Sequence, residues 1–145
     1  MTYAIAMDVG TTTIWGTLLD LESKQEIARE IVMNPQREWG ADVVTRMTKS
    51  HSKLRRLLSV ELNNLVLKLC RKGKIILKDV KRILVVSNAV IDHYLKEINH
   101  FERLPMVSKY IGSDALAGAL YADLDKIKNN QLLIDLGTNA EMVLS

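Results

Sequence analysis

The strongest constraint on the fold is a short turn motif that occurs twice, each time after an apolar run. Tyr3 to Met7 leads into Asp8-Val9-Gly10-Thr11, and Gln131 to Ile134 leads into Asp135-Leu136-Gly137-Thr138. Short apolar runs of this kind are typical of buried strands. A glycine just after a strand lets the backbone approach a ligand, and the N–H groups that follow can form an anion-binding nest. The sequence therefore predicts two facing phosphate loops, with binding residues Gly10, Thr11, Thr12, Thr13, Gly137, Thr138 and Asn139.

Each motif also carries an aspartate, Asp8 in the first and Asp135 in the second. An aspartate at a strand end can hold magnesium, usually through water, because this ion keeps most of its hydration shell. Magnesium and the two loops together could clamp the terminal phosphates of ATP. We therefore predict Asp8 and Asp135 as the catalytic and magnesium-binding residues. Neither a dinucleotide-binding glycine fingerprint nor a P-loop lysine motif is present, so the competing glycine signatures are missing.

The order of expected elements indicates the fold class. Strands are expected over 3–7, 13–21 and 25–33, a short helix near 40–42, a long helix over 52–73, a strand over 82–87, a helix over 88–98, an extended segment over 106–111, a helix over 113–124 and strands over 131–136 and 141–144. This is the order of a ribonuclease-H-like α/β domain, a mixed sheet with helices on both faces. We expect residues 1–129 to form a first lobe with the first phosphate loop, and residues 130–145 to begin a truncated second lobe with the second loop.

Composition narrows the class of protein. The chain has 145 residues, 48% apolar and 26% charged, which is typical of one globular domain. No apolar stretch approaches the roughly 20 residues of a membrane span, and the start lacks a signal-peptide pattern, so we expect a cytoplasmic protein without membrane contact. The single cysteine, Cys70, cannot form an internal disulfide or hold an iron–sulfur cluster from this chain alone.

A basic segment lies in the middle of the chain. Between Lys49 and Arg82 there are eleven lysines and arginines against two acidic residues. Such a stripe could contact nucleic acid or an acidic protein. Leucines at helical spacing and the absence of aromatic stacking residues favour the solvent-facing side of an amphipathic helix instead. We therefore do not expect nucleic-acid binding.

Six blocks in fixed order carry a family resemblance. They are Ala6 to Thr13, Asn34 to Gln36, Gly40 to Arg46, Val86 to Asn88 with His93, Ile111 to Ala115, and Leu133 to Glu141. Together they resemble the ATPase domain of the reductive activators of corrinoid-dependent proteins. That domain is actin-like and belongs to the superfamily of acetate and sugar kinases, heat-shock chaperones and actin.

The resemblance implies a protein that uses ATP and magnesium to drive an electron from an iron–sulfur cluster to an inactive Co(II) corrinoid protein. By analogy with the wider superfamily, Asp8 and Asp135 would be the magnesium-side carboxylates, between the loops Gly10 to Thr13 and Gly137 to Asn139. The blocks that begin at Asn34 and Gly40 resemble segments beside the cleft, without individual roles.

The chain also departs from the family pattern. The iron–sulfur module that the family carries before this region is absent here, so we expect it on another chain. Ser87 stands where the family tends to have glycine, and the connection from Asn99 to Pro105 is shorter than usual. The adenosine-binding half would follow Ser145, which leaves open whether the isolated chain is an enzyme.

Three functional hypotheses follow. The first is an ATPase-type activator of a corrinoid protein, and the second is a non-enzymatic binding or regulatory module that a partner chain completes. The third, a small-molecule kinase of the same fold, is disfavoured by the asparagine-proline-glutamine block. The last two strands either fold back onto their own sheet or leave an exposed apolar surface that could pair two copies into a homodimer. Its residues are Leu132, Leu133, Ile134, Leu136, Met142, Val143 and Leu144.

Overall fold

The computed structural model describes residues 1–39, 51–126, 129–136 and 140–144. The elements are β1 (Tyr3–Val9), β2 (Thr13–Asp20), β3 (Glu26–Met33), η1 (Pro35–Trp39), α2 (His51–Gly73), η2 (Leu77–Asp79), β4 (Val80–Ser87), α3 (Ala89–Leu95), β5 (Glu102–Arg103), α4 (Ser113–Tyr121), β6 (Leu132–Leu136) and β7 (Ala140–Leu144). No helix in these ranges has the length and apolar character needed to span a membrane.

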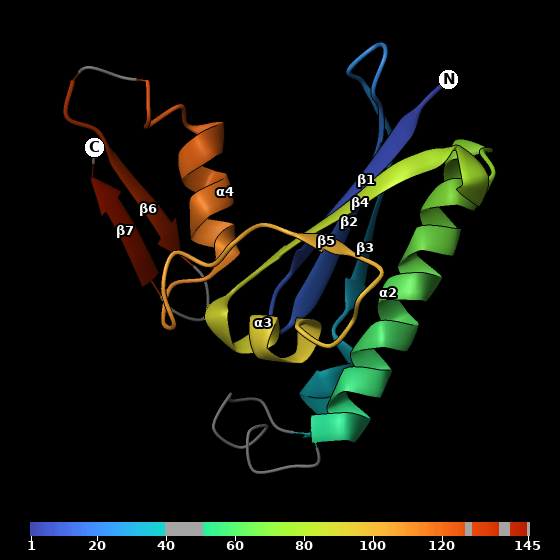
Figure 1. The fold of residues 1–145 in the computed structure, drawn as a ribbon, viewed down its shortest axis with the longest axis horizontal. Helices are drawn as coiled ribbons and strands as arrows, with labels where there is room; N and C mark the ends of the chain where they lie inside the picture. Colours follow the sequence, from blue (N-terminus) through green and yellow to red (C-terminus); the bar gives the residue numbers. More distant parts are fainter. Residues whose placement is uncertain (40–50, 127–128, 137–139, 145) are drawn as a thin grey trace.

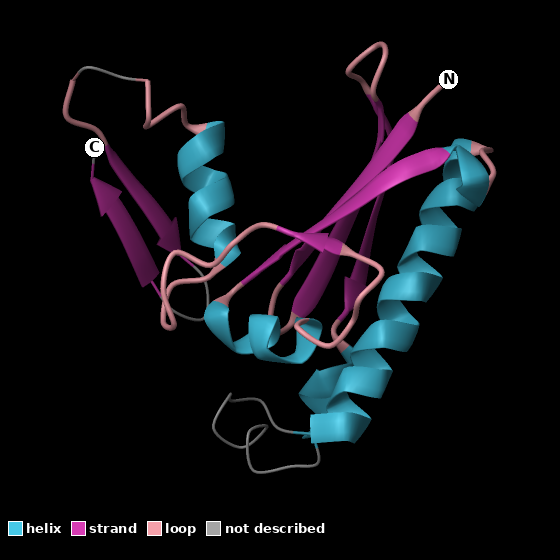
Figure 2. Cartoon of the chain, in the orientation of Figure 1, coloured by secondary structure: helices cyan, strands magenta, loops and turns pink. Residues whose placement is uncertain are grey.

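A five-stranded mixed sheet forms the body of the molecule, with strand order β3-β2-β1-β4-β5 (Figures 1 and 2). Strand β1 runs antiparallel to β2 and parallel to β4, and β5 continues the parallel half. Figure 1 places α2 and α4 on opposite sides of this sheet. The predicted fold class, a mixed α/β sheet with a parallel centre and helices packed on it, is confirmed.

The core lies between one face of the sheet and α2. Alternate residues of β1 are buried on this face, as the two-residue period of a strand requires. Five leucines of α2 meet them at three- and four-residue spacing, Leu54, Leu58, Leu62, Leu65 and Leu69, and each is almost completely buried. Burying a leucine side chain contributes about 2 kcal/mol, so this helix is held mainly by its apolar stripe. Gly16 allows the close approach, since a Cβ there would lie 3.0 Å from Leu65 and Leu69.

The second, smaller sheet is the β6–β7 hairpin, which packs against α4 (Figure 1). Gly118 of α4 faces it, and a Cβ at this position would lie 3.2 Å from Leu133. The other face of the hairpin is exposed and entirely apolar, with cross-strand pairs Leu132/Leu144, Ile134/Met142 and Leu136/Ala140. We expected Leu133 and Val143 on that exposed surface as well. They occupy the alternate positions of the two strands and are only partly exposed.

Most expected elements agree with the structure within a few residues. Strand β5 was not expected, because two charged residues carry no strand pattern. Residues 107–111 form a bend rather than an extended segment, and the Ser108 hydroxyl accepts the N–H groups of Tyr110 and Ile111. The short helix expected near 40–42 lies outside the described residues, although the 3-10 helix η1 ends just before it.

Candidate functional site

The first predicted loop, between β1 and β2, turns tightly. The Gly10 N–H donates to the Thr13 carbonyl at 2.9 Å, and Thr11 is buried. A Cβ at Gly10 would lie 3.0 Å from that carbonyl oxygen, so glycine suits the close approach of the two backbone segments. The loop residues line a common cavity.

This cavity has a volume of about 370 Å³ and lies between the main sheet and the hairpin. It is lined by Asp8, Gly10, Thr11, Thr12, Thr13, Asn88, Asp114, Asp135, Leu136 and Glu141. The structure thus brings Asp8 and Asp135 to one cavity, although their strands belong to different sheets. Gly137, Thr138 and Asn139, the second predicted loop, lie outside the described residues.

The cavity is strongly acidic. Burial, followed by the charges of Asp114 and Asp135, raises the pKa of Asp8 to about 6. Burial also raises the pKa of Asp114. A hydrogen bond from the Ala115 N–H lowers this pKa, and the charge of Asp135 raises it further. The pKa of Glu141 is raised by burial and by the same two aspartates. Four carboxylates and no basic side chain occur among the described lining residues, so a phosphate could enter this cavity only with a cation.

Sequence reasoning did not assign a site role to three of the polar lining residues, Asn88, Asp114 and Glu141. Asp114 follows Gly112-Ser113 at the start of α4, and a signal was available: an aspartate in the first turn of a helix that precedes the second motif. Among the described residues, no group of three or more histidine, cysteine, aspartate or glutamate side chains has the geometry of a metal-binding cluster. A magnesium ion held through water remains compatible with the carboxylates that line the cavity.

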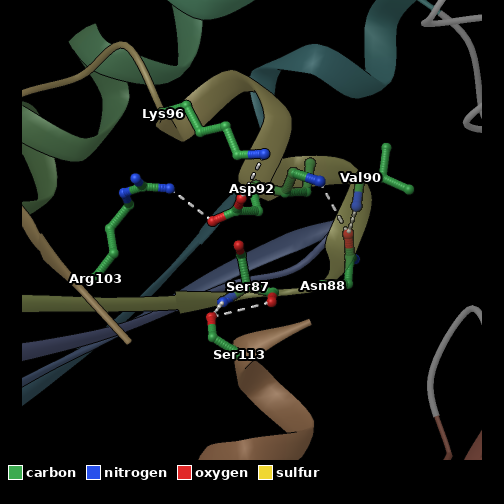
Figure 3. Close-up of polar contacts among 8 residues, drawn as sticks. Ser87, Asn88, Val90, Asp92, Lys96, Arg103 and Ser113 are labelled. Carbon is green, nitrogen blue, oxygen red and sulfur yellow. Dashed lines mark hydrogen bonds and ion pairs between the residues drawn. The ribbon is translucent and has the colours of Figure 1, made fainter. Parts of the chain in front are cut away.

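The position of Asp114 depends on how α4 is fastened to the end of β4 (Figure 3). The buried Ser113 hydroxyl accepts the Ser87 N–H at 3.0 Å and donates to the Ser87 carbonyl at 3.3 Å. Gly112 precedes it, and a Cβ there would lie 2.3 Å from the same carbonyl oxygen. The two hydrogen bonds, together with the close approach that Gly112 allows, hold the first turn of α4 against β4, beside the cavity.

A second polar cluster lies around α3 and includes Asn88 and Asp92 (Figure 3). Asn88 caps α3, and its side-chain oxygen accepts the N–H groups of Val90 and Ile91. One turn further, the buried Asp92 pairs with Arg103 at 2.8 Å and with Lys96 at 3.6 Å. The pair joins α3 to β5 and so supports the wall that carries Asn88.

The arrangement of strands and helices is that of the actin-like ATPase fold. One solved structure with this architecture is the Ppx/GppA phosphatase of Aquifex aeolicus. It matches with a TM-score of 0.63 at 14% identity and covers 100% of this chain and 48% of its own, which shows the fold alone.

Within that class, the chain belongs to the RACo middle region family, whose model matches residues 3–102. The corrinoid activation enzyme RamQ of Eubacterium limosum is 25% identical over an alignment 180 positions long, which covers 98% of this chain and 30% of that protein. The solved reductive activator for corrinoid, iron–sulfur protein matches with a TM-score of 0.87 at 25% identity, covering 99% of this chain and 29% of its own. The chain therefore spans about 30% of these relatives, and the family resemblance seen in the sequence is confirmed.

Proposed function

We propose that this chain is the ATP-binding lobe of an activator that uses ATP to drive the reductive reactivation of a corrinoid protein. The observation that carries the proposal is the acidic cavity, in which the β1–β2 loop faces carboxylates from α4, β6 and β7. Family membership and the similarity to two corrinoid activators support the same function.

In this proposal each part of the cavity has its own task. The loop from Gly10 to Thr13 receives phosphate oxygens with its N–H and hydroxyl groups, and we assign the same task to Gly137 to Asn139. Asp8 and Asp135 hold magnesium through water, and the ion neutralises the charge that the carboxylates and phosphates share. Asp114 and Glu141 are placed to accept hydrogen bonds from those waters or from an attacking water.

Magnesium-dependent ATP binding tests the proposal. Two-dimensional amide NMR detects weak binding, and we expect ATP to shift the signals of Gly10 to Thr13 only when magnesium is present. Asp8→Ala should abolish this response. Asp123→Ala is the matched control, because Asp123 pairs with Lys126 on the surface and does not line the cavity. Shifts that do not depend on magnesium, or that survive Asp8→Ala, would contradict the proposed site.

A second candidate is a non-enzymatic binding or regulatory module that a partner chain completes. The exposed apolar face of β6–β7 favours it, because exposed patches of this kind mark contact surfaces. ATP binding without any hydrolysis, in the presence of every proposed partner, would favour this module over an ATPase.

The partners of the activator are also proposals. They are a corrinoid protein, an iron–sulfur module on another chain, and a second copy of this chain that pairs through the C-terminal strand. A cytoplasmic location and the lack of nucleic-acid binding remain predictions from the sequence.

A further inference from the structure

The segment Asn34-Pro35-Gln36, which had no assigned role, lies directly behind the β1–β2 loop. Asn34 and Gln36 are completely buried although both are polar. The Asn34 side-chain amide donates to the Gly10 carbonyl at 2.8 Å, and its backbone N–H donates to the Thr12 carbonyl at 2.8 Å. A residue 24 positions along the chain therefore holds two peptide groups of the loop.

These contacts determine which way the loop's peptide groups point. A trans peptide is planar, so a carbonyl oxygen held on one side places the next N–H on the opposite side. Asn34 binds the carbonyls of Gly10 and Thr12, and the Gly10 N–H binds that of Thr13. These three carbonyl oxygens are thus hydrogen-bonded within the protein. An unpaired carbonyl oxygen turned into the cavity would instead repel a phosphate.

Asn34 is itself held in place by its neighbours. Its side-chain oxygen accepts the Gln36 N–H at 2.9 Å, which selects the orientation in which the amide nitrogen faces Gly10. The Gln36 side chain then donates to the Leu54 carbonyl at 3.0 Å, and Leu54 is a buried residue in the first turn of α2. A continuous chain of hydrogen bonds therefore runs from the loop to the long helix.

We propose that Asn34 is the positioning residue of the first phosphate loop: it orients the peptide groups after Gly10 and Thr12 for a phosphate, and Gln36 anchors it to α2. This inference rests on the proposed function, since it concerns the same cavity. Asn34 does not line that cavity and acts only through the loop.

Asn34→Ala tests the inference with two readouts. Without ligand, the carbonyl ¹³C shift of Gly10 and the amide ¹⁵N shift of Thr11 should change, because the hydrogen bond to Gly10 is lost. With magnesium, the affinity for ATP should fall about tenfold, the equivalent of one lost charge-assisted contact. Val66→Ala is the control: it removes buried apolar atoms from α2 and lowers stability, but it should change affinity less than twofold.

The outcomes separate the inference from the function. Unchanged Gly10 and Thr11 shifts in Asn34→Ala would overturn the inference, and so would changed shifts with an unchanged affinity. If the unaltered chain binds no ATP with magnesium, the proposed function fails. The inference about Asn34 then survives only if magnesium pyrophosphate still binds and Asn34→Ala weakens that binding. Equal losses in Asn34→Ala and Val66→Ala would show that Asn34 contributes only stability.

Discussion

Replacing Gly112 with alanine should damage the junction between α4 and β4. The backbone angles at Gly112, φ −74° and ψ 178°, suit any residue, so only space opposes a side chain. The added Cβ would lie 2.3 Å from the Ser87 carbonyl oxygen and 2.5 Å from the Asn88 Cα. Both are backbone atoms, so neither can rotate away, and the start of α4 must move.

The expected loss of stability follows from this displacement. Overpacking in a tight site costs about 1–3 kcal/mol. A shift of α4 also breaks the two hydrogen bonds between Ser113 and Ser87, each of which contributes about 1 kcal/mol. Gly112→Ala should therefore lower the free energy of unfolding by about 3–5 kcal/mol. The effect should also reach Asp114, because that carboxylate follows directly in the first turn.

Gly118→Ala is the matched control on the same helix. Its Cβ would meet only the end of the Leu133 side chain at 3.2 Å, which can give way. Alanine is favoured over glycine inside a helix by about 1 kcal/mol. This gain offsets the cost of moving the Leu133 side chain, so the net change in the free energy of unfolding should be close to zero. Urea unfolding followed by circular dichroism measures both variants. If Gly112→Ala is as stable as Gly118→Ala within about 0.5 kcal/mol, the close-packing argument is wrong.

Three further predictions concern charge and association. Because the folded-state pKa of Asp8 is raised from 3.8 to about 6, its ionisation opposes folding, so this contribution to stability falls as pH rises from about 4 to 6. Thermal melts should show Asp8→Asn more stable than the unaltered chain at pH 7 but not at pH 4, and stabilisation by magnesium at pH 7.5 that disappears at pH 5. Arg103→Met should lower the free energy of unfolding by about 2 kcal/mol, and Lys96→Met should lower it by less. The reason is that, of these two residues, only Arg103 makes a hydrogen bond to the buried Asp92 carboxylate. Equal losses in urea unfolding would contradict this. Light scattering should show a dimer at micromolar concentration that the double change Ile134→Lys with Met142→Lys abolishes; a monomer in both cases removes the homodimer.

The main sheet was predictable because its strands and its long helix carry strong periodic patterns. Leucines at helical spacing predicted α2 almost to the residue, and the apolar runs predicted β1 and β4. Strand β5 was not predictable, because Glu102 and Arg103 join the sheet only through the edge of β4. The side-chain contacts of β5, from Arg103 to Asp92 and from Glu102 to Arg82, are tertiary and carry no local signal.

The candidate site was predictable where the signal was local and not where it depended on packing. The repeated aspartate and glycine turn pointed to Asp8 and Asp135, which the structure brings to one cavity. Glu141 could not be chosen from the sequence, since the alternation of β7 puts it beside Asp135 only after the hairpin forms. The contact between Asn34 and Gly10 was hidden for the same reason, because the two residues lie 24 positions apart in the sequence.

The two faces of the β6–β7 hairpin connect the site to association. Asp135 and Glu141 are cross-strand partners on the face that turns to α4 and the cavity, while Ile134 and Met142 are partners on the exposed face. Because the side-chain period of a strand is two, a shift of one strand by a single residue would exchange these faces. A partner that covers the apolar face would therefore also hold the register that keeps both carboxylates at the cavity. Association through this face should consequently strengthen magnesium binding, and the monomeric double variant should bind magnesium and ATP more weakly although neither substitution touches the cavity. Equal magnesium affinity in the dimer and in that monomer would refute the coupling.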